Sequence, residues 1–207
     1  MGIASGSVSY LLFVAEPVTE GFEERFCEAM YNHRFMEIDP RSEVEKAHGW
    51  VRFDDAFSGE IDPAVLVPPS GQILFRLRVD TLKIPASTLK AYVDQAARER
   101  AKRDGRDQLA RKELDVLKLE VKKQLRVRSL PRLQLVEVAW NIHSGEVRLF
   151  TTSKGSATLF AETFEKTFER KLQYVGLLEV LPLRGMAQEE IDSLSLIDAE
   201  RFHLIEN

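Results

Sequence analysis

A group of lysines and arginines in the middle of the chain has the residue types and the spacing needed to hold phosphate groups. On the helix predicted over residues 108–127, a rotation of about 100° per residue brings several of them to one face, which only Asp115 interrupts. They are Arg111, Lys118, Lys122 and Arg126. Cations repeated along a helix can follow a phosphate backbone. They are also typical of an ordinary solvated helix face, so both interpretations stay open.

The charges are distributed unevenly along the chain. The 207 residues carry 29 Lys+Arg and 33 Asp+Glu, a formal net charge of −4. Residues 98–132 hold 13 basic and 6 acidic side chains, whereas residues 1–97 have a net charge of −6 and residues 133–207 a net charge of −5. One basic segment between two acidic flanks favours a polyanionic partner.

The other side chains able to do chemistry are scattered. The four histidines, none at the i, i+4 spacing of a helical zinc site, are His33, His48, His143 and His203. The sequence holds neither a Gly-rich phosphate loop ending in Gly-Lys-Ser/Thr nor a Gly-x-Ser-x-Gly nucleophile motif. The single Cys27 lies in an apolar helical pattern, which favours packing over a role as nucleophile. We therefore predict no catalytic centre, no metal and no cofactor.

Four smaller features each have two interpretations. The adjacent carboxylates Asp54-Asp55 and Glu189-Glu190 fit solvated acids better than a metal site. Ser153–Ser156 precedes a helical pattern, where an N-cap is favoured over an anion site. Trp50 and Trp140 lie in strand patterns and are predicted core residues rather than platforms for base stacking.

The composition predicts a folded intracellular protein. With 44% hydrophobic residues, the chain can bury the core of one large domain or of two small ones. One cysteine excludes an intrachain disulfide and any zinc site made of several cysteines, and it suits a reducing cytosol. The apolar runs are far shorter than the roughly 18–20 residues that span a bilayer. We expect no secretory signal and no membrane partner.

Hydrophobic periodicity predicts alternating strands and helices. Strands are predicted over residues 8–14, with Val8, Tyr10, Leu12 and Val14 on one side, and over 49–53, 72–82, 133–140, 146–152 and 177–183. Helices are predicted around Phe22–Met30, over 85–103 and 108–127, and from Ser153 or Ser156 through Phe168. Asp104-Gly105 should end the second helix, Asp107 should cap the third, and Asn141–Gly145 should close a hairpin.

Several short stretches occur in the order found in one known family. They are His33–Phe35, Gly49–Val51, Ser70–Ile73, Ile84-Pro85, a charged helix with Val121 and Leu125, Trp140 with the Gly145 hairpin, Ser153–Ser156, and Leu181–Leu183. Each stretch alone is common, so their order and spacing carry the inference. From its opening strand to about Leu183, the chain resembles the bacterial recombination-associated RdgC family.

The resemblance implies a sequence-independent binder of double-stranded DNA. Family members form a head-to-head, ring-like homodimer through which duplex passes, and they limit the access of a recombinase to DNA. By this resemblance the protein is expected to be a cytoplasmic, nucleoid-associated protein of DNA recombination and not an enzyme. Typical members continue well beyond the point matching Leu183, whereas this chain ends at Asn207, so an open dimer or a ring completed by a partner is expected.

The family also has a Leu-Pro-Arg-Ala-Phe loop at the tip of the ring, after the second long helix. The matching stretch here is Arg126–Leu130, in which Arg128 takes the place of the arginine, Leu130 that of the phenylalanine, and Val127 that of the proline. The arginine of the family's loop is therefore expected to have a counterpart here, in Arg128. The aromatic contact made by the family's phenylalanine is not expected. The predicted DNA-binding residues are Arg103, Arg106, Arg111, Lys112, Lys118, Lys122, Lys123, Arg126, Arg128, Leu130 and Arg132.

We therefore predict an α+β fold with mixed, mainly antiparallel sheets and two long, charged central helices that form a projecting tip. The expected parts are an N-terminal α/β part (1–83), a basic helical tip (84–132), a β-hairpin plus helix part (133–184) and an acidic C-terminal segment (185–207). Two alternatives to DNA binding remain. One is a protein-interaction scaffold with the same fold, suggested by the exposed-looking Val116 and Leu119, and the other is a hydrolase without a known motif.

Overall fold

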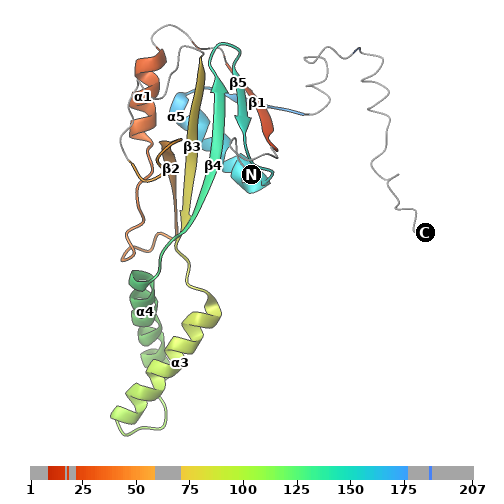
Figure 1. Ribbon diagram of the computed structural model, residues 1–207. Helices are drawn as coiled ribbons and strands as arrows, with labels where there is room; N and C mark the ends of the chain where they lie inside the picture. The colour runs from red at the N-terminus through yellow and green to blue at the C-terminus, as the bar shows by residue number, and fades with distance from the viewer. Residues whose placement is uncertain (1–8, 17, 19–21, 59–70, 177–186, 188–207) are drawn as a thin grey trace, which may run out of the picture.

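The computed structural model describes residues 9–16, 18, 22–58, 71–176 and 187, and the described chain has an α+β fold (Figure 1). Four helices occur among the described residues: α1 (Phe22–Asn32), α3 (Ala86–Arg103), α4 (Arg111–Arg128) and α5 (Lys154–Phe168). The strands are β1 (Leu11–Ala15), β2 (Lys46–Arg52), β3 (Gln72–Thr81), β4 (Arg132–Asn141), β5 (Glu146–Leu149) and β6 (Leu172–Val175). The predicted fold class is confirmed at this level.

The strands form one antiparallel sheet in the order β2-β3-β4-β5-β1-β6. Its longest ladder joins β3 to β4, from Gln72 opposite Asn141 to Thr81 opposite Arg132. The predicted parts 1–83 and 133–184 therefore contribute strands to the same sheet. We call this sheet with α1 and α5 the body of the molecule.

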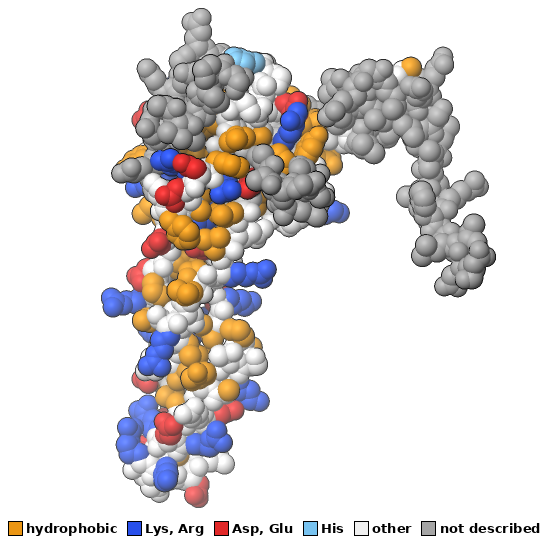
Figure 2. Space-filling view, viewed as in Figure 1, with side chains coloured by type: hydrophobic (Ala, Val, Ile, Leu, Met, Phe, Trp, Pro, Cys, Tyr) orange, Lys and Arg blue, Asp and Glu red, His pale blue; other side chains and the backbone are white. Residues whose placement is uncertain are grey.

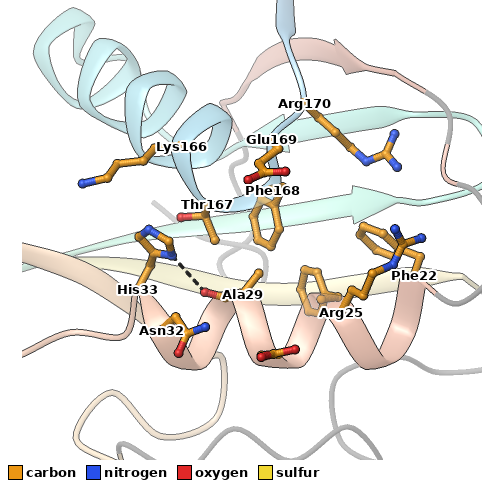
Figure 3. Close-up of a pocket in the computed structure, with 12 residues that line it drawn as sticks. Phe22, Arg25, Ala29, Asn32, His33, Lys166, Thr167, Phe168, Glu169 and Arg170 are labelled. Carbon is orange, nitrogen blue, oxygen red and sulfur yellow. Dashed lines mark hydrogen bonds between the residues drawn. The ribbon is translucent and has the colours of Figure 1, made fainter.

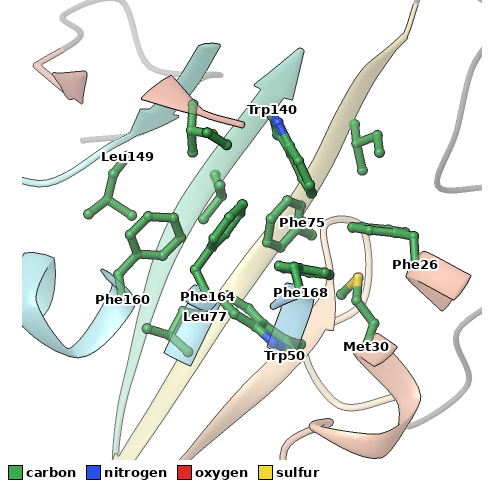
Figure 4. Packing of buried hydrophobic residues seen from close by; sticks show 14 of the residues in the cluster. Phe26, Met30, Trp50, Phe75, Leu77, Trp140, Leu149, Phe160, Phe164 and Phe168 are labelled. Atoms are coloured by element: carbon green, nitrogen blue, oxygen red, sulfur yellow. The ribbon is translucent and has the colours of Figure 1, made fainter. Parts of the chain in front are cut away.

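The hydrophobic core lies between one face of the sheet and helices α1 and α5 (Figure 4). The predicted alternation of β3 is confirmed, because Ile73, Phe75 and Leu77 are completely buried. Trp50 and Trp140 are core residues, as predicted, with exposed fractions of 1% and 0%. Aromatic rings fill most of the space, and each large ring buried here contributes about 1.5–3 kcal/mol or more through the hydrophobic effect.

Helices α3 and α4 form an antiparallel pair that projects from one end of the sheet, and we call this pair the arm (Figure 1). Strand β3 leads into α3, and α4 leads into β4. The arm has a small core of its own, in which Ala101, Leu109, Leu117 and Val121 are buried. The predicted turn after α3 is confirmed, with Gly105 at a φ of 65° that favours glycine.

Two local predictions were wrong, and one strand was missed. Helix α4 begins after Ala110 and not after Asp107, because Glu113 accepts a hydrogen bond from the backbone N–H of Ala110 (2.8 Å) and supplies the cap. In β1 the buried residues are Phe13 and Ala15, so the predicted Tyr10 side of the strand faces away from the core. Strand β6 was not predicted, and the strand predicted over residues 177–183 lies outside the described residues.

None of the helices in the described part of the chain combines the length and the apolar character needed to cross a membrane.

Candidate nucleic-acid interface

Most of the predicted DNA-binding residues lie on the surface of the arm or where it joins the sheet. Blue lysine and arginine side chains project from both sides of the arm (Figure 2). The exposed cations of the predicted set are Arg103, Arg106, Arg111, Lys112, Lys118, Lys123, Arg128 and Arg132. Since they surround the helices instead of lining a single face, they form a broad positive surface and not a row that fits one groove.

Arg106 is exposed but already bound to acidic side chains. Its guanidinium donates to Asp104 (2.9 Å) and to both carboxylate oxygens of Glu113 (3.0 and 3.1 Å). Hydrogen bonding to Arg106 lowers the pKa of Glu113 and that of Asp104 below their ordinary values. Arg106 therefore closes the loop between α3 and α4, and its charge is largely compensated within the arm.

Lys122 also has a partner. Its Nζ lies 3.1 Å from a carboxylate oxygen of Glu45, which is located in the segment before β2. The hydrogen bond from Lys122 is the main cause that lowers the pKa of Glu45. Lys122 thus joins the arm to the body, and the sequence held no signal for this pair because 77 residues separate its members.

The expectation that Arg126 belongs to an exposed cationic face is wrong. Its exposed fraction is 2%. The guanidinium donates to three backbone carbonyls, those of Pro40 (3.1 Å), Leu82 (3.1 Å) and Val44 (2.7 Å). Helical periodicity placed Arg126 beside Lys122 correctly, but it could not reveal that the last turn of α4 lies against the body.

The predicted location of the Arg126–Leu130 loop also needs correction. The far end of the arm is the connection between α3 and α4, residues 104–110, whereas residues 129–131 connect the base of the arm to β4 (Figure 1). Arg128 is exposed there, and Leu130 is 93% exposed. The stretch therefore lies at the junction with the sheet and not at a tip.

Exposed apolar side chains accompany the cations of α4. Val116 and Leu119 are 54% and 60% exposed, as the sequence suggested. At about 100° per residue they share a side of the helix with Lys112 and Lys123, opposite the buried Leu117 and Val121. The outer side of α4 is thus both apolar and positively charged.

A second candidate site is a cavity of about 290 Å³ between α1 and the end of α5 (Figure 3). Its lining includes Arg25, Lys166 and Arg170, but also Glu28 and Glu169. Arg170 lies over the ring of Phe22, with 5.6 Å between the guanidinium carbon and the ring centre, and it donates to the carbonyl of Glu16. Charges of both signs line this cavity, so it is a weaker candidate for a polyanion than the arm.

Several of the remaining chemical candidates have structural roles, whereas Glu189-Glu190 and His203 lie outside the described residues. Cys27 is buried, as predicted for a packing residue. Ser153 caps α5 by accepting a hydrogen bond from the N–H of Ser156 (3.3 Å). Asp54 pairs with Arg52 (2.6 Å), and Asp55 accepts bonds from two backbone N–H groups in the following turn. Among the described residues, no cluster of His, Cys, Asp and Glu side chains suits a metal ion.

Comparison of the chain with models of known protein families and with curated proteins finds no match.

Proposed function

We propose that this protein binds double-stranded DNA through the arm, without preference for a sequence. The observation that carries the proposal is the set of exposed cations on α4, above all Arg111, Lys112, Lys118 and Lys123. Lysines and arginines neutralise phosphates and release condensed counterions, which is the main source of sequence-independent affinity for DNA. The order of short stretches that resembles the RdgC family favours the same proposal.

The arrangement of the arm favours phosphate contacts over base contacts. A helix that reads bases presents side chains such as Asn, Gln and Arg along one face that enters the major groove. On α4 the cations extend to different sides, and valine and leucine lie between them. Contacts of this kind position a protein on a duplex without distinguishing its sequence.

Titration of unrelated duplexes at several salt concentrations tests the proposal. The logarithm of the binding constant should fall by about 0.9 for each phosphate contact per decade of salt, and duplexes of different sequence should bind with similar affinity. A strong preference for one duplex, or no binding at low salt, would contradict the proposal.

The resemblance extends the proposal to an assembly and a cellular role. Two copies of the chain would act as a homodimer, associate with the nucleoid and limit the access of a recombinase to DNA. Light scattering at micromolar concentration tests the assembly, because a monomer would exclude a ring-like dimer. A strand-exchange assay with a recombinase, in the presence and absence of the protein, tests the role.

An alternative function is that of a protein-interaction scaffold, which the exposure of Val116 and Leu119 favours. Exposed apolar side chains suit contact with another protein, whereas a phosphate backbone would contact only the cations around them. Replacing both residues by serine distinguishes the two functions. If the protein binds DNA, the double variant should keep its affinity for duplex. If the protein is a scaffold, neither the unaltered protein nor the double variant should bind duplex, and the double variant should lose its protein partner.

A further inference from the structure

The arm and the body have separate hydrophobic cores. The buried cluster of the body includes residues of α1, α5 and the sheet, and that of the arm comprises Ala101, Leu109, Leu117 and Val121. In the part of the chain that the structure describes, no residue belongs to both clusters. A shared apolar core therefore does not fix the direction in which the arm projects, and other contacts must do so.

Arg126 makes the most extensive of these contacts. Its three carbonyl acceptors come from two different segments of the body: Pro40 and Val44 precede β2, and Leu82 follows β3. The same two segments are tied to each other, because the N–H of Leu82 donates to the carbonyl of Glu45 (2.8 Å). Arg126 thus joins the base of α4 to a small hydrogen-bonded unit of the body.

The chemistry of this site requires an arginine. A planar guanidinium offers donors in a fixed fork, so it can bind several carbonyls at once, whereas the ammonium of lysine is a compact charge that cannot reach all three. Arg126 is also buried, and hydrogen bonds from a charged donor are strong in such surroundings. Lys122 and Glu45 add a weaker tie, since both side chains are about one-third exposed or more.

We propose that Arg126 is a positioning residue that holds the arm at a fixed angle to the sheet. The effect of this angle on DNA binding rests on the proposed function. The exposed cations of α4 lie at a distance from Arg126, so a change of angle displaces them. At about 1.5 Å per residue, the part of α4 before Arg126 extends about 22 Å, so a tilt of about 20° at its base moves the other end by about 8 Å. That displacement exceeds the rise of about 3.4 Å per nucleotide along a duplex.

The angle of the arm is measured without DNA, by electron–electron distance spectroscopy between nitroxide labels. The labels replace two exposed residues, Arg103→Cys in the arm and Lys171→Cys in the body, in a Cys27→Ala background. The chain with Arg126 should give one narrow distance distribution. Arg126→Gln should increase the width of the distance distribution about twofold or more. The width for Arg126→Lys should lie between those of the unaltered chain and Arg126→Gln. Lys123→Gln, an exposed change on the same helix, is the matched control and should leave the distribution unchanged.

Duplex binding is then measured for the unaltered chain, Arg126→Gln and Arg126→Lys, without the cysteine substitutions. Arg126→Gln should weaken it about tenfold, equivalent to the loss of one or two phosphate contacts, although Arg126 itself is buried. If no variant binds duplex, the proposed function fails while the distances still test the role of Arg126. An unchanged distribution in a folded Arg126→Gln variant would overturn the positioning role. If Arg126→Gln does not fold, Arg126→Lys decides, and failure of both to fold would show that Arg126 serves stability instead.

Discussion

The body and the arm bury different kinds of side chain. In the body, aromatic rings fill the core, with Phe164 only 4.9 Å from Trp140 and 4.7 Å from Phe168 between ring centres. In the arm the small core consists of alanine, leucine and valine, and most other positions are polar or charged. The body is thus built for stability, while the arm has only enough core to hold two helices together and presents charge to the solvent.

The two regions also use arginine differently. In the body, Arg78 is buried, with its guanidinium 4.0 Å from the centre of the Phe35 ring and bonded to Asp80 at 2.7 and 3.0 Å. In the arm, Arg111 and Arg128 are exposed, whereas Arg126 at its base is buried against the body. Counting cations therefore overestimates a binding surface, and only the structure separates a buried, paired arginine from an exposed one.

The largest effect on stability is expected in the body. Phe164→Ala should lower the free energy of unfolding by about 3–5 kcal/mol, because it leaves a cavity among buried aromatic rings. Urea unfolding followed by tryptophan fluorescence measures the change. Met36→Ala, at a position that is 63% exposed, is the control and should cost less than about 0.5 kcal/mol. Equal effects of the two changes would refute the packing described for the body.

A smaller and local effect is expected in the arm. Leu117→Ala should lower the stability of the helix pair by about 2 kcal/mol, since Leu117 is 6% exposed in a small core that can partly collapse. Leu119→Ala, two residues away and 60% exposed, is the matched control. Amide hydrogen exchange should show faster exchange in α3 and α4 and unchanged exchange in β3 and β4. Faster exchange throughout the sheet would mean that the two cores are not independent.

The smallest effect concerns the loop that closes the arm. Because Arg106 lowers the pKa of Glu113, Arg106→Gln should raise that pKa toward its ordinary value of 4.5. The carboxylate binds a proton more weakly in the folded arm, so its contribution to stability is complete above pH 4.5 and is lost as the pH falls through the lowered pKa. NMR titration of the Glu113 side chain measures the shift. An unchanged titration curve in the variant would exclude Arg106 as the cause.

Much of the fold could be predicted from local patterns. Alternation along residues 72–82 and the start and stop signals of the helix over 85–103 depend on neighbours in the chain, and both gave the correct elements. The start of α4 was misplaced because the backbone of Ala110 is capped by Glu113 from inside the helix, whereas Asp107 offered a conventional cap in the sequence. Strand β6 was missed because its four residues are too few to show a period.

The candidate site could be predicted only in part. Sequence located the basic segment and its exposed lysines, because charge is a local property. The sequence could not show that Lys122 and Arg126 of the arm bind groups of the body, because their partners are 44 to 86 residues away in the chain. Long-range contacts of this kind determine which cations remain available for a ligand.

The most direct test of DNA binding by the arm is a comparison of two charge reversals of equal size. One variant replaces Arg111, Lys112, Lys118 and Lys123 in the arm with glutamate, and the other replaces the exposed Lys46, Lys154, Lys166 and Lys171 of the body. Both carry the same net charge, so a difference between them reports on location alone. The arm variant should bind duplex at least about a hundredfold more weakly than the unaltered protein, and the slope of log K against log salt should become about 3–4 units less steep. The affinity of the body variant should stay within about threefold of that of the unaltered protein. If the folded arm variant binds duplex as well as the body variant does, the arm is not the DNA-binding surface.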